Sequence, residues 1–359
     1  MLVPRAPTHF ALAGSLLLGA FIAGCHGPDD SACTAAWEAP LDDADADDQD
    51  LGCAILSVAA DGPGDAYFAG GSLGVEPAKG CALHFDGEQW TELDLDVPET
   101  YWWVAMTPSG AAWLVGEDGL AVRWGGGVGT RFETGVDATL FGVWAAADDD
   151  VWAVGGSDGG GDSDVLLHFD GAAWTQVAPP EVRGTYYFKV WGAAADDVWV
   201  VGAEGLILHY DGQAWSLHTE WTDEYGTAPR LFTVHGRAAD DVWAVGESTT
   251  VLHFDGASWT EWEDPTGATV FGGGLTGVHV APSGSVCVVG DGGVRFTIPT
   301  EGAHVETLPG ATDPDLHATW CDDDGEEFAV GGNYLESQPA ARDGAILHYG
   351  CPLSREGLP

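Results

Sequence analysis

The sequence predicts an all-β protein, a seven-bladed β-propeller in which each blade has four strands. A segment of about 39 to 47 residues recurs seven times, which is the range expected of one propeller blade. The 359 residues include 17 Trp and 53 Gly, a composition typical of aromatic-rich sheets joined by tight turns. The seventh repeat lacks a fourth strand, and a matching strand near the N-terminus is expected to close the ring.

The clearest repeat runs from Phe188 to Trp215. It contains three apolar runs, F-K-V-W-G, V-W-V-V-G and L-I-L-H-Y, and a fourth run that opens at Trp215. Turn residues separate these runs at positions 194–197, 203–205 and 211–212. Short runs rich in β-branched and aromatic residues, bounded by such turns, predict four consecutive strands.

The second strand carries the same two marks in every repeat. One is a central residue, usually aromatic, and the other is a glycine three residues later, where the chain must turn or approach another backbone closely. The central residues are Tyr67, Trp113, Trp152, Trp199, Trp243, Cys287 and Phe328. The glycines are Gly70, Gly116, Gly155, Gly202, Gly246, Gly290 and Gly331.

The third and fourth strands are marked by the motif L-H-F-D-G-x-x-W, which occurs at positions 83–90, 167–174 and 252–259. The Asp-Gly pair predicts a hairpin with a type I′ turn, in which both central residues have positive φ. The second and sixth repeats depart from the motif, with R-W-G-G at 123–126 and V-R-F at 294–296.

The seventh repeat stops at Cys351, directly after L-H-Y-G. Residues 33–37, C-T-A-A-W, match G-A-A-W at 171–174 in register and in kind. The sequence therefore predicts a propeller over 51–352 that is closed by a strand near 33–40, with a C-terminal tail at 353–359.

The cysteines predict disulfides. Setting Cys25 aside leaves six, and an even number in an exported protein indicates a disulfide framework, although six cysteines allow 15 pairings. The preferred pairs are Cys33–Cys351 across the closure, Cys53–Cys81 within the first blade and Cys287–Cys321 between the sixth and seventh blades.

The N-terminus predicts export. Residues 1–24 have one early Arg and an apolar run at 10–23, which is too short to span a bilayer and typical of a signal peptide. The following I-A-G-C at 22–25 resembles the bacterial lipobox, which implies that Cys25 is lipidated with acyl chains such as palmitate. His26 replaces the Asp that retains enterobacterial lipoproteins in the inner membrane, so we expect the outer membrane. The acidic stretch up to Asp50 is expected to be a tether.

The repeats resemble a known group of propellers. The pattern V-W-A-V-G followed by L-H-F-D-G-A-A-W, at 151–174, is similar to repeats common in exported proteins of myxobacteria and related bacteria. The D-G-x-x-W turn is distantly similar to the Asp-box of BNR/sialidase propellers, and the glycine pairs to kelch repeats. These resemblances imply a fold, and function does not follow from fold.

Charge limits the partners. The chain has 57 Asp and Glu against 11 Lys and Arg, so its surface repels nucleic acid and anionic lipid. We therefore expect contact with the membrane only through the N-terminal lipid. No cofactor is expected, with calcium as the one possible exception. Adjacent carboxylates in the turns repel each other, and either full solvation or a bound calcium ion would offset this repulsion. The candidates are Asp148, Asp149, Asp150, Asp196, Asp197, Asp240 and Asp241.

Five histidines, His84, His168, His209, His253 and His348, share one position in the repeat. Repeat symmetry spreads them around the ring, so we expect packing against the neighbouring aromatic residue and no metal site. Similarly, Asp86, Asp170, Asp211 and Asp255 are expected to accept backbone hydrogen bonds in the hairpin turns.

The sequence favours binding over catalysis. It contains no G-x-S-x-G, no H-E-x-x-H and no P-loop, and it lacks the F-R-I-P-like start of a sialidase. Aromatic residues and a few cations occur instead on connections of variable length, which fits recognition of a glycan or of an envelope or extracellular protein. The candidates are Tyr101, Trp102, Arg183, Tyr186, Tyr187, Trp221, Tyr225 and Arg230.

We therefore expect a lipid-anchored binding or scaffolding module of the cell envelope. One alternative is a hydrolase or lyase that acts on glycans with carboxylates on the variable-loop face. A second is a structural envelope protein without a defined ligand.

Overall fold

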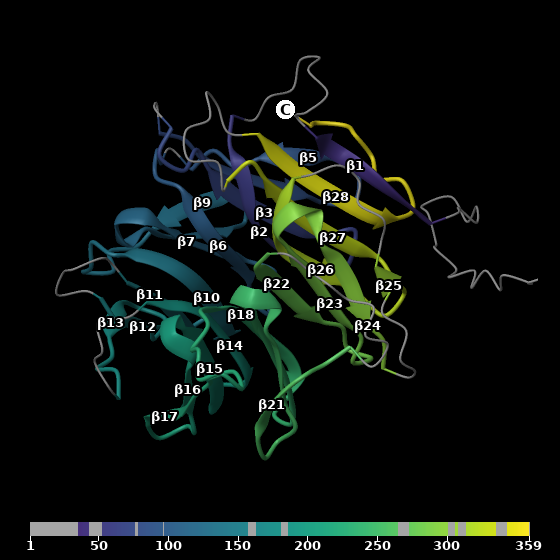
Figure 1. Ribbon diagram of the computed structural model, residues 1–359. Helices are drawn as coiled ribbons and strands as arrows, with labels where there is room; N and C mark the ends of the chain where they lie inside the picture. The colour runs from purple at the N-terminus through teal and green to yellow at the C-terminus, as the bar shows by residue number, and fades with distance from the viewer. Residues whose placement is uncertain are drawn as a thin grey trace, which may run out of the picture.

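The fold was obtained as a computed structural model, which describes residues 35–42, 52–75, 78–95, 97–156, 163–180, 186–264, 273–300, 306–307, 314–334 and 343–358. In these residues the strands form seven antiparallel sheets of four strands each, arranged as a ring around a central axis (Figure 1). The predicted seven-bladed propeller is confirmed.

The strands follow one another from the axis outward in each blade. The first two blades contain β2 (Ala54–Ala60), β3 (Ala66–Gly71), β4 (Gly80–Phe85) and β5 (Trp90–Glu92), then β6 (Tyr101–Met106), β7 (Ala112–Gly116), β8 (Ala121–Gly125) and β9 (Val128–Arg131). The third and fourth contain β10 (Thr139–Ala147), β11 (Asp150–Gly156), β12 (Val165–Phe169) and β13 (Trp174–Gln176), then β14 (Tyr187–Ala194), β15 (Asp197–Gly202), β16 (Leu206–Tyr210) and β17 (Trp215–Glu220).

The fifth and sixth blades contain β18 (Leu231–Ala238), β19 (Asp241–Gly246), β20 (Val251–Phe254) and β21 (Trp259–Glu261), then β22 (Leu275–Val280), β23 (Val286–Gly290), β24 (Arg295–Ile298) and β25 (Glu306–Thr307). The seventh contains β26 (Asp315–Cys321), β27 (Glu327–Gly332), β28 (Gly344–Gly350) and β1 (Ala36–Asp42). Single 3₁₀ turns follow four of the second strands, η1 (Glu117–Gly119), η2 (Ala203–Gly205), η3 (Glu247–Thr249) and η4 (Asp291–Gly293).

The register agrees with the repeat read from the sequence. In the fourth blade, Trp199 at the centre of β15 pairs with His209 of β16, and the equivalent residues pair in the other blades. Gly202 ends β15 where a Cβ atom would lie 2.3 Å from the carbonyl oxygen of Tyr186, so the close approach of the two strands requires glycine there.

The hairpin between the third and fourth strands differs from the predicted type I′ turn. Phe85 pairs with Trp90, so the loop has four residues, and of the Asp-Gly pair only Gly87 has positive φ. The Asp86 carboxylate accepts the backbone N–H groups of Glu88 and Gln89, at 3.0 and 2.8 Å. This side-chain capping, which repeats at Asp170, Asp211 and Asp255, stabilises the longer loop. A two-residue turn with two positive φ values occurs in the second blade, at Gly126 and Gly127.

The ring closes as predicted. Strand β1 pairs with β28 as the outer strand of the seventh blade, with Trp37 opposite Tyr349, and Figure 1 shows purple β1 beside yellow β28. The preceding residue of β28, the fully buried His348, lies 2.8 Å from Glu326 and 3.5 Å from Glu38 of β1. Glu38 also accepts the backbone N–H of Leu353 at 2.7 Å, so both ends of the propeller share one polar cluster.

The residues after β28 continue across to the first blade. The backbone carbonyl of Glu356 accepts the N–H of Trp90, and the carbonyl of Ser354 accepts its indole N–H, both at 2.8 Å. The tail therefore fastens the outer strand β5 of the first blade to the end of the chain.

Two of the three predicted disulfides are confirmed. Cys53 is bonded to Cys81, and Cys287 to Cys321. Cys351 is also a disulfide cysteine, but its predicted partner Cys33 lies outside the described residues, so this pair stays a prediction.

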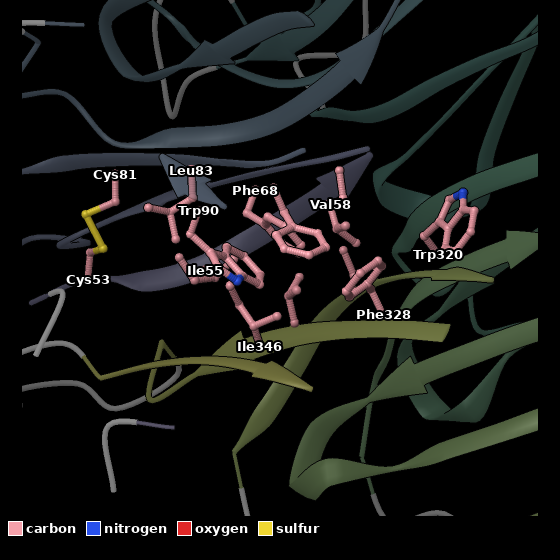
Figure 2. Close-up of a cluster of buried hydrophobic side chains, with 14 residues drawn as sticks. Cys53, Ile55, Val58, Phe68, Cys81, Leu83, Trp90, Trp320, Phe328 and Ile346 are labelled. Carbon is pink, nitrogen blue, oxygen red and sulfur yellow. A yellow bond between two sulfur atoms is a disulfide. The ribbon is translucent and has the colours of Figure 1, made fainter. Parts of the chain in front are cut away.

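The core lies between neighbouring blades. Between the first and seventh blades, Phe68 and Phe328 meet edge to face with ring centres 5.4 Å apart. Figure 2 shows this cluster extending from the Cys53–Cys81 bond at one end to Trp320 at the other. Because equivalent layers separate the other blades, the inner strands are held in fixed positions around the axis.

Candidate functional site: the axial channel

The seven inner strands each contain a β-bulge near their first residue. In β6 the pairing with β7 shifts between Tyr101 and Trp103, which leaves Trp102 as the extra residue, and the same shift occurs in the other six blades. A bulge re-aims the side chain of its extra residue. The bulged residues are Leu56, Trp102, Phe141, Phe188, Phe232, Thr276 and His317.

Five of these bulged residues form an arc of half-buried aromatic side chains. Successive ring centres are 5.2 Å apart for Trp102 and Phe141, 5.7 Å for Phe141 and Phe188, and 5.7 Å for Phe188 and Phe232. His317 follows 6.1 Å from Trp102 on the other side. We call these five residues the aromatic collar, and the face of the propeller where the inner strands begin the upper face.

Further along the inner strands, toward the opposite face, lies a cavity of about 230 Å³ that every blade contributes to. We call it the axial cavity. Its lining is mainly Val, Ala and indole rings, and it includes no Asp or Glu, although the chain has 57 of them. The polar or aromatic side chains that line it are Trp103, Trp144, Lys189, Trp191, Thr233, His235, His279, Thr319 and Trp320.

Lys189 is the one charged residue in this lining, and its side chain is only 5% exposed. Its ammonium donates a hydrogen bond to the carbonyl oxygen of Phe141 at 2.8 Å and lies 3.9 Å from the centre of the Trp103 ring. Burial lowers the pKa of Lys189 to about 7, because an ammonium loses hydration in this environment. No described carboxylate forms an ion pair with Lys189.

Two histidines line the same cavity and are stacked with ring centres 4.2 Å apart. The Nδ1 of His235 accepts the backbone N–H of Val280 at 3.0 Å, and the Nδ1 of His279 accepts that of Cys321 at 3.2 Å. Burial lowers the pKa of His235 well below its ordinary value and that of His279 to about 4. Both rings are therefore neutral at pH 7, with the proton on Nε2.

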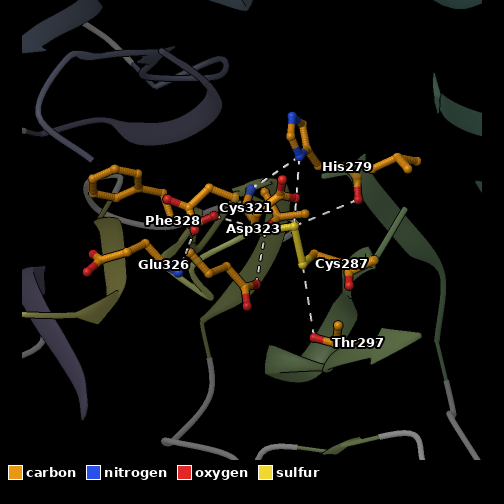
Figure 3. The surroundings of a disulfide bond; sticks show 12 residues. His279, Cys287, Thr297, Cys321, Asp323, Glu326 and Phe328 are labelled. Carbon is orange, nitrogen blue, oxygen red and sulfur yellow. Dashed lines mark hydrogen bonds between the residues drawn. A yellow bond between two sulfur atoms is a disulfide. The ribbon is translucent and has the colours of Figure 1, made fainter. Parts of the chain in front are cut away.

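His279 also lies against a disulfide. Figure 3 shows its imidazole beside Cys321, which is bonded to Cys287. His317 of the collar donates its Nδ1–H to the carbonyl of Leu56, and burial followed by the charge of Lys189 lowers its pKa to about 3.

These contacts also solve a problem of the fold. The inner strands are sheet edges, so the backbone groups on their free side need partners. Side chains of the adjacent blade supply several of them: Thr233 donates to the carbonyl of Thr276 at 2.6 Å, and Ser57 accepts the N–H of Val104 at 3.1 Å. The axial lining is thus ordered by hydrogen bonds between blades.

The predicted binding residues are dispersed by the structure. Tyr101 and Tyr187 are each 1% exposed, within the inner strands and beneath the collar, which corrects the expectation that they project from loops. Their positions match that of Leu140, so they fill a core position. Trp102 is part of the collar, and Tyr186 packs beside it with its ring 6.0 Å from Phe141. Arg183 lies outside the described residues.

The remaining candidates lie farther out on the connection between the fourth and fifth blades. Trp221 packs partly against the core, while Tyr225 is 85% exposed. Arg230 is exposed and forms an ion pair with Glu247 at 3.5 Å. These three therefore border the upper face without converging on the collar.

The repeated histidines have a structural role, as predicted. His209 lies 2.7 Å from Asp197 and stacks on Trp199 with ring centres 4.1 Å apart. The same Asp–His pair and stacking recur for His84, His168 and His253.

Four of the seven candidate calcium ligands have hydrogen-bond partners within the protein, and the other three lie beside turn glycines. Asp148 accepts hydrogen bonds from Ser109, Thr107 and Arg123, which hold the pKa of that carboxyl below its ordinary value. Asp150, Asp197 and Asp241 bind histidines, whereas Asp149, Asp196 and Asp240 pack against the turn glycines. No group of three or more His, Cys, Asp or Glu among the described residues is placed to hold a metal. Calcium binding stays an untested alternative to full solvation of these carboxylates.

Sequence reasoning missed Lys189 and most of the collar. The signal was present in the sequence. In the second to fifth repeats, the residue after the first apolar residue of the inner strand is aromatic, namely Trp102, Phe141, Phe188 and Phe232. Reading these as ordinary strand residues hid them, because alternation alone does not reveal a bulge.

Comparison with known proteins supports the fold alone. No protein-family model matches the chain, and no curated protein does. A streptogramin B lyase structure matches 89% of this chain and 98% of its own, with TM-score 0.66 and 12% identity. YCF48 bound to D1 peptide covers 88% and 97% (TM-score 0.62, 13% identity), and the WD40 β-propeller domain of Doa1 covers 86% and 95% (TM-score 0.63, 9% identity).

Within the described residues, no helix has the length and apolar character needed to cross a membrane.

Proposed function

We propose that this propeller is a recognition module that binds an extended segment of a partner protein at the aromatic collar. The carrying observation is that bulges in four consecutive blades turn four large aromatic rings, and the bulge of the seventh blade one imidazole, toward the mouth of the axial channel. Rigid aromatic rings provide a large contact area at low entropic cost, which is typical of binding hot spots.

The charge around the collar favours a segment with basic as well as apolar side chains. The turns between the second and third strands lie on the upper face and carry exposed Asp118 and Glu204 with half-buried Glu117 and Glu247. The net charge of the chain is −46, so its field attracts cations over a distance of about one Debye length. A peptide-bound propeller, YCF48 with D1 peptide, is among the similar structures, which supports a protein partner as the first choice.

The place of action is proposed from the N-terminus. Cleavage of a signal peptide at Gly24 and lipidation of Cys25 would anchor the propeller in the outer membrane, on a tether of roughly 25 residues. The confirmed disulfides Cys53–Cys81 and Cys287–Cys321 support an oxidising compartment. Labelling with a radioactive fatty acid, lost in Cys25→Ser, tests this part.

A hydrolase is the weaker candidate. It would need two carboxylates about 5 to 10 Å apart around a bound glycan, and the axial cavity is lined by none of the described carboxylates. A glycan array tests this alternative and also tests glycan recognition without catalysis.

The proposed function is tested by selecting phage-displayed peptides on the purified protein. We expect enriched peptides to bind at least tenfold more weakly to Phe188→Ala and Trp102→Ala. Phe132→Ala is the matched control, because Phe132 is a half-buried aromatic residue of the second blade that packs against Trp113, away from the collar. Equal binding by all variants, or enrichment on a glycan array alone, would contradict a peptide site at the collar.

A further inference from the structure

The axial cavity differs from the rest of the molecule in the hydrogen bonds that its side chains can make. Lysine and tryptophan side chains only donate, and Lys189, Trp103, Trp144, Trp191 and Trp320 all line the cavity. Its wall therefore offers a cation and N–H donors, with no described carboxylate, inside an otherwise strongly acidic protein.

The two stacked histidines add donors of the same kind. Because Nδ1 of His235 and of His279 accepts a backbone N–H, the single proton of each neutral ring is on Nε2. A neutral imidazole with this tautomer donates from Nε2. Thr233 and Thr319, in contrast, use their hydroxyl hydrogens within the protein, on the carbonyl of Thr276 and at Glu327 or the carbonyl of Phe328.

A structural role accounts poorly for Lys189. Its ammonium has three N–H donors, and the one described hydrogen bond uses a single donor, on Phe141. Burying an ammonium without a carboxylate costs free energy, whereas Met or Leu would fill the same space without this cost. The ring of Trp103 offsets only part of it, since a cation–π contact contributes about 1–2 kcal/mol.

We infer that the axial cavity binds a carboxylate attached to an aromatic or other apolar group, with the ammonium of Lys189 as its counter-ion. The indole walls would hold the apolar part, and the histidine and indole N–H groups would orient the acid. A volume of about 230 Å³ suits a ligand smaller than most drug-sized molecules. This site is distinct from the collar, so it goes beyond the proposed function. The carboxylate could come from a free acid or from the C-terminus of a peptide.

The test uses a probe pair of nearly the same shape, 4-fluorophenylacetate and its uncharged amide, observed by ¹⁹F NMR with the purified protein. We expect the acid to bind at least tenfold more tightly than the amide. We expect Lys189→Met to lose this preference, while Lys79→Met keeps it because Lys79 is an exposed lysine paired with Glu92 at 4.0 Å. Equal binding of acid and amide, or an acid preference that survives Lys189→Met, would overturn the inference.

The pH dependence of the unmodified protein gives a second measurement, independent of how the variant folds. His317, His235 and His279 share the channel with Lys189, and their lowered pKa values keep them neutral from pH 6.5 to 9. Glu327 lies behind the wall, where Thr319 donates a hydrogen bond to it, and burial raises its pKa to about 7. Its ionisation would lower affinity for an acid in the same direction, so the profile is repeated on Glu327→Gln. Since the pKa of Lys189 is about 7, affinity for the acid should fall about tenfold or more over this range. A flat profile would also overturn the inference.

The source of the carboxylate is decided by a further comparison. A peptide ending in a free Phe carboxylate is compared with the same peptide ending in an amide, on the natural protein and on Phe188→Ala. A preference for the free terminus, lost in Phe188→Ala while 4-fluorophenylacetate still binds, supports the cavity and identifies a peptide terminus. Binding of the small acid without any such peptide preference supports the cavity and identifies a free acid. In both cases the collar and the cavity are tested separately.

Discussion

Lys189 and Trp103 are in contact although they belong to blades that are not adjacent. The lysine leaves the inner strand of the fourth blade, crosses that of the third and places its ammonium 3.9 Å from the indole centre in the second. Gly142 allows the inner strands of the third and fourth blades to approach closely here, because a Cβ atom there would lie 3.0 Å from the Cα of Lys189. The ammonium of Lys189 is therefore in contact with residues of the second and third blades.

The first prediction concerns the stability of Lys189→Met. The pKa of Lys189 is lowered to about 7 in the folded protein and is 10.5 for the free side chain, so the unfolded state binds more protons between these values. The stability of the natural protein, relative to the variant, therefore rises with pH from about 7 to 10.5. We expect the variant to be more stable by roughly 1–3 kcal/mol at pH 6, and this gain to shrink above pH 7.

Urea denaturation of both proteins at several pH values measures this difference, with Lys79→Met as the control for loss of a surface charge. A variant that is less stable than the natural protein at pH 6 would show that the contacts of the ammonium between blades stabilise the fold by more than its burial costs.

The second prediction concerns His279. Its pKa is lowered to about 4, so between pH 4 and 6.5 the unfolded state binds more protons, and stability is lost as the pH falls through this window. In His279→Asn the amide oxygen can replace Nδ1 as acceptor for the N–H of Cys321, but it does not titrate. We expect a smaller loss of melting temperature between pH 6.5 and 4 in the variant. An unchanged acid profile would assign the acid sensitivity to other groups.

The third prediction concerns the disulfides. The bonds Cys53–Cys81 and Cys287–Cys321 close loops of 28 and 34 residues, and loop entropy predicts about 3.5 kcal/mol for each. We expect Cys81→Ser and Cys321→Ser each to lower the melting temperature by several degrees under oxidising conditions. Cys351→Ser should do the same if it removes the predicted bond to Cys33. The same melting temperatures are measured in reducing buffer, where the natural protein and the variants should no longer differ.

The fourth prediction concerns calcium. Asp148, Asp150, Asp197 and Asp241 have hydrogen-bond partners within the protein, and full solvation is the preferred explanation for the carboxylates of Asp149, Asp196 and Asp240. We expect no heat when calcium is titrated to millimolar concentration in a calorimeter. Heat that disappears in a variant with Asp149, Asp196 and Asp240 changed to Asn would establish the turns as calcium sites.

The architecture was predictable because it repeats. The same aromatic residue, glycine and Asp-Gly turn recur in blade after blade, so each repeat supports the reading of the others. Closure by β1 was also predictable, since residues 33–37 resemble a fourth strand and the last blade lacked one. The hairpin type was mistaken because the Asp86 side chain, rather than backbone conformation alone, determines the loop.

The site was less predictable than the fold. The bulges depend on how two strands pair, and the burial of Lys189 depends on contacts with Phe141 and Trp103 of two other blades. Neither is visible in the local pattern of one strand. Tyr101 and Tyr187 were misjudged for the same reason, because an aromatic residue next to a loop in the sequence can occupy the core position of a strand.

Closure by an N-terminal strand also determines the order of folding. Glu38 and Leu353 are hydrogen-bonded yet 315 positions apart, so the ring cannot be completed before nearly the whole chain is available. During synthesis β1 appears before the other strands of the propeller and stays unpaired until β28 has been made. Closing so large a loop is an entropically slow step. We therefore expect the seventh blade to form last, and the rate at which Trp37 becomes protected from solvent to report the final step of maturation.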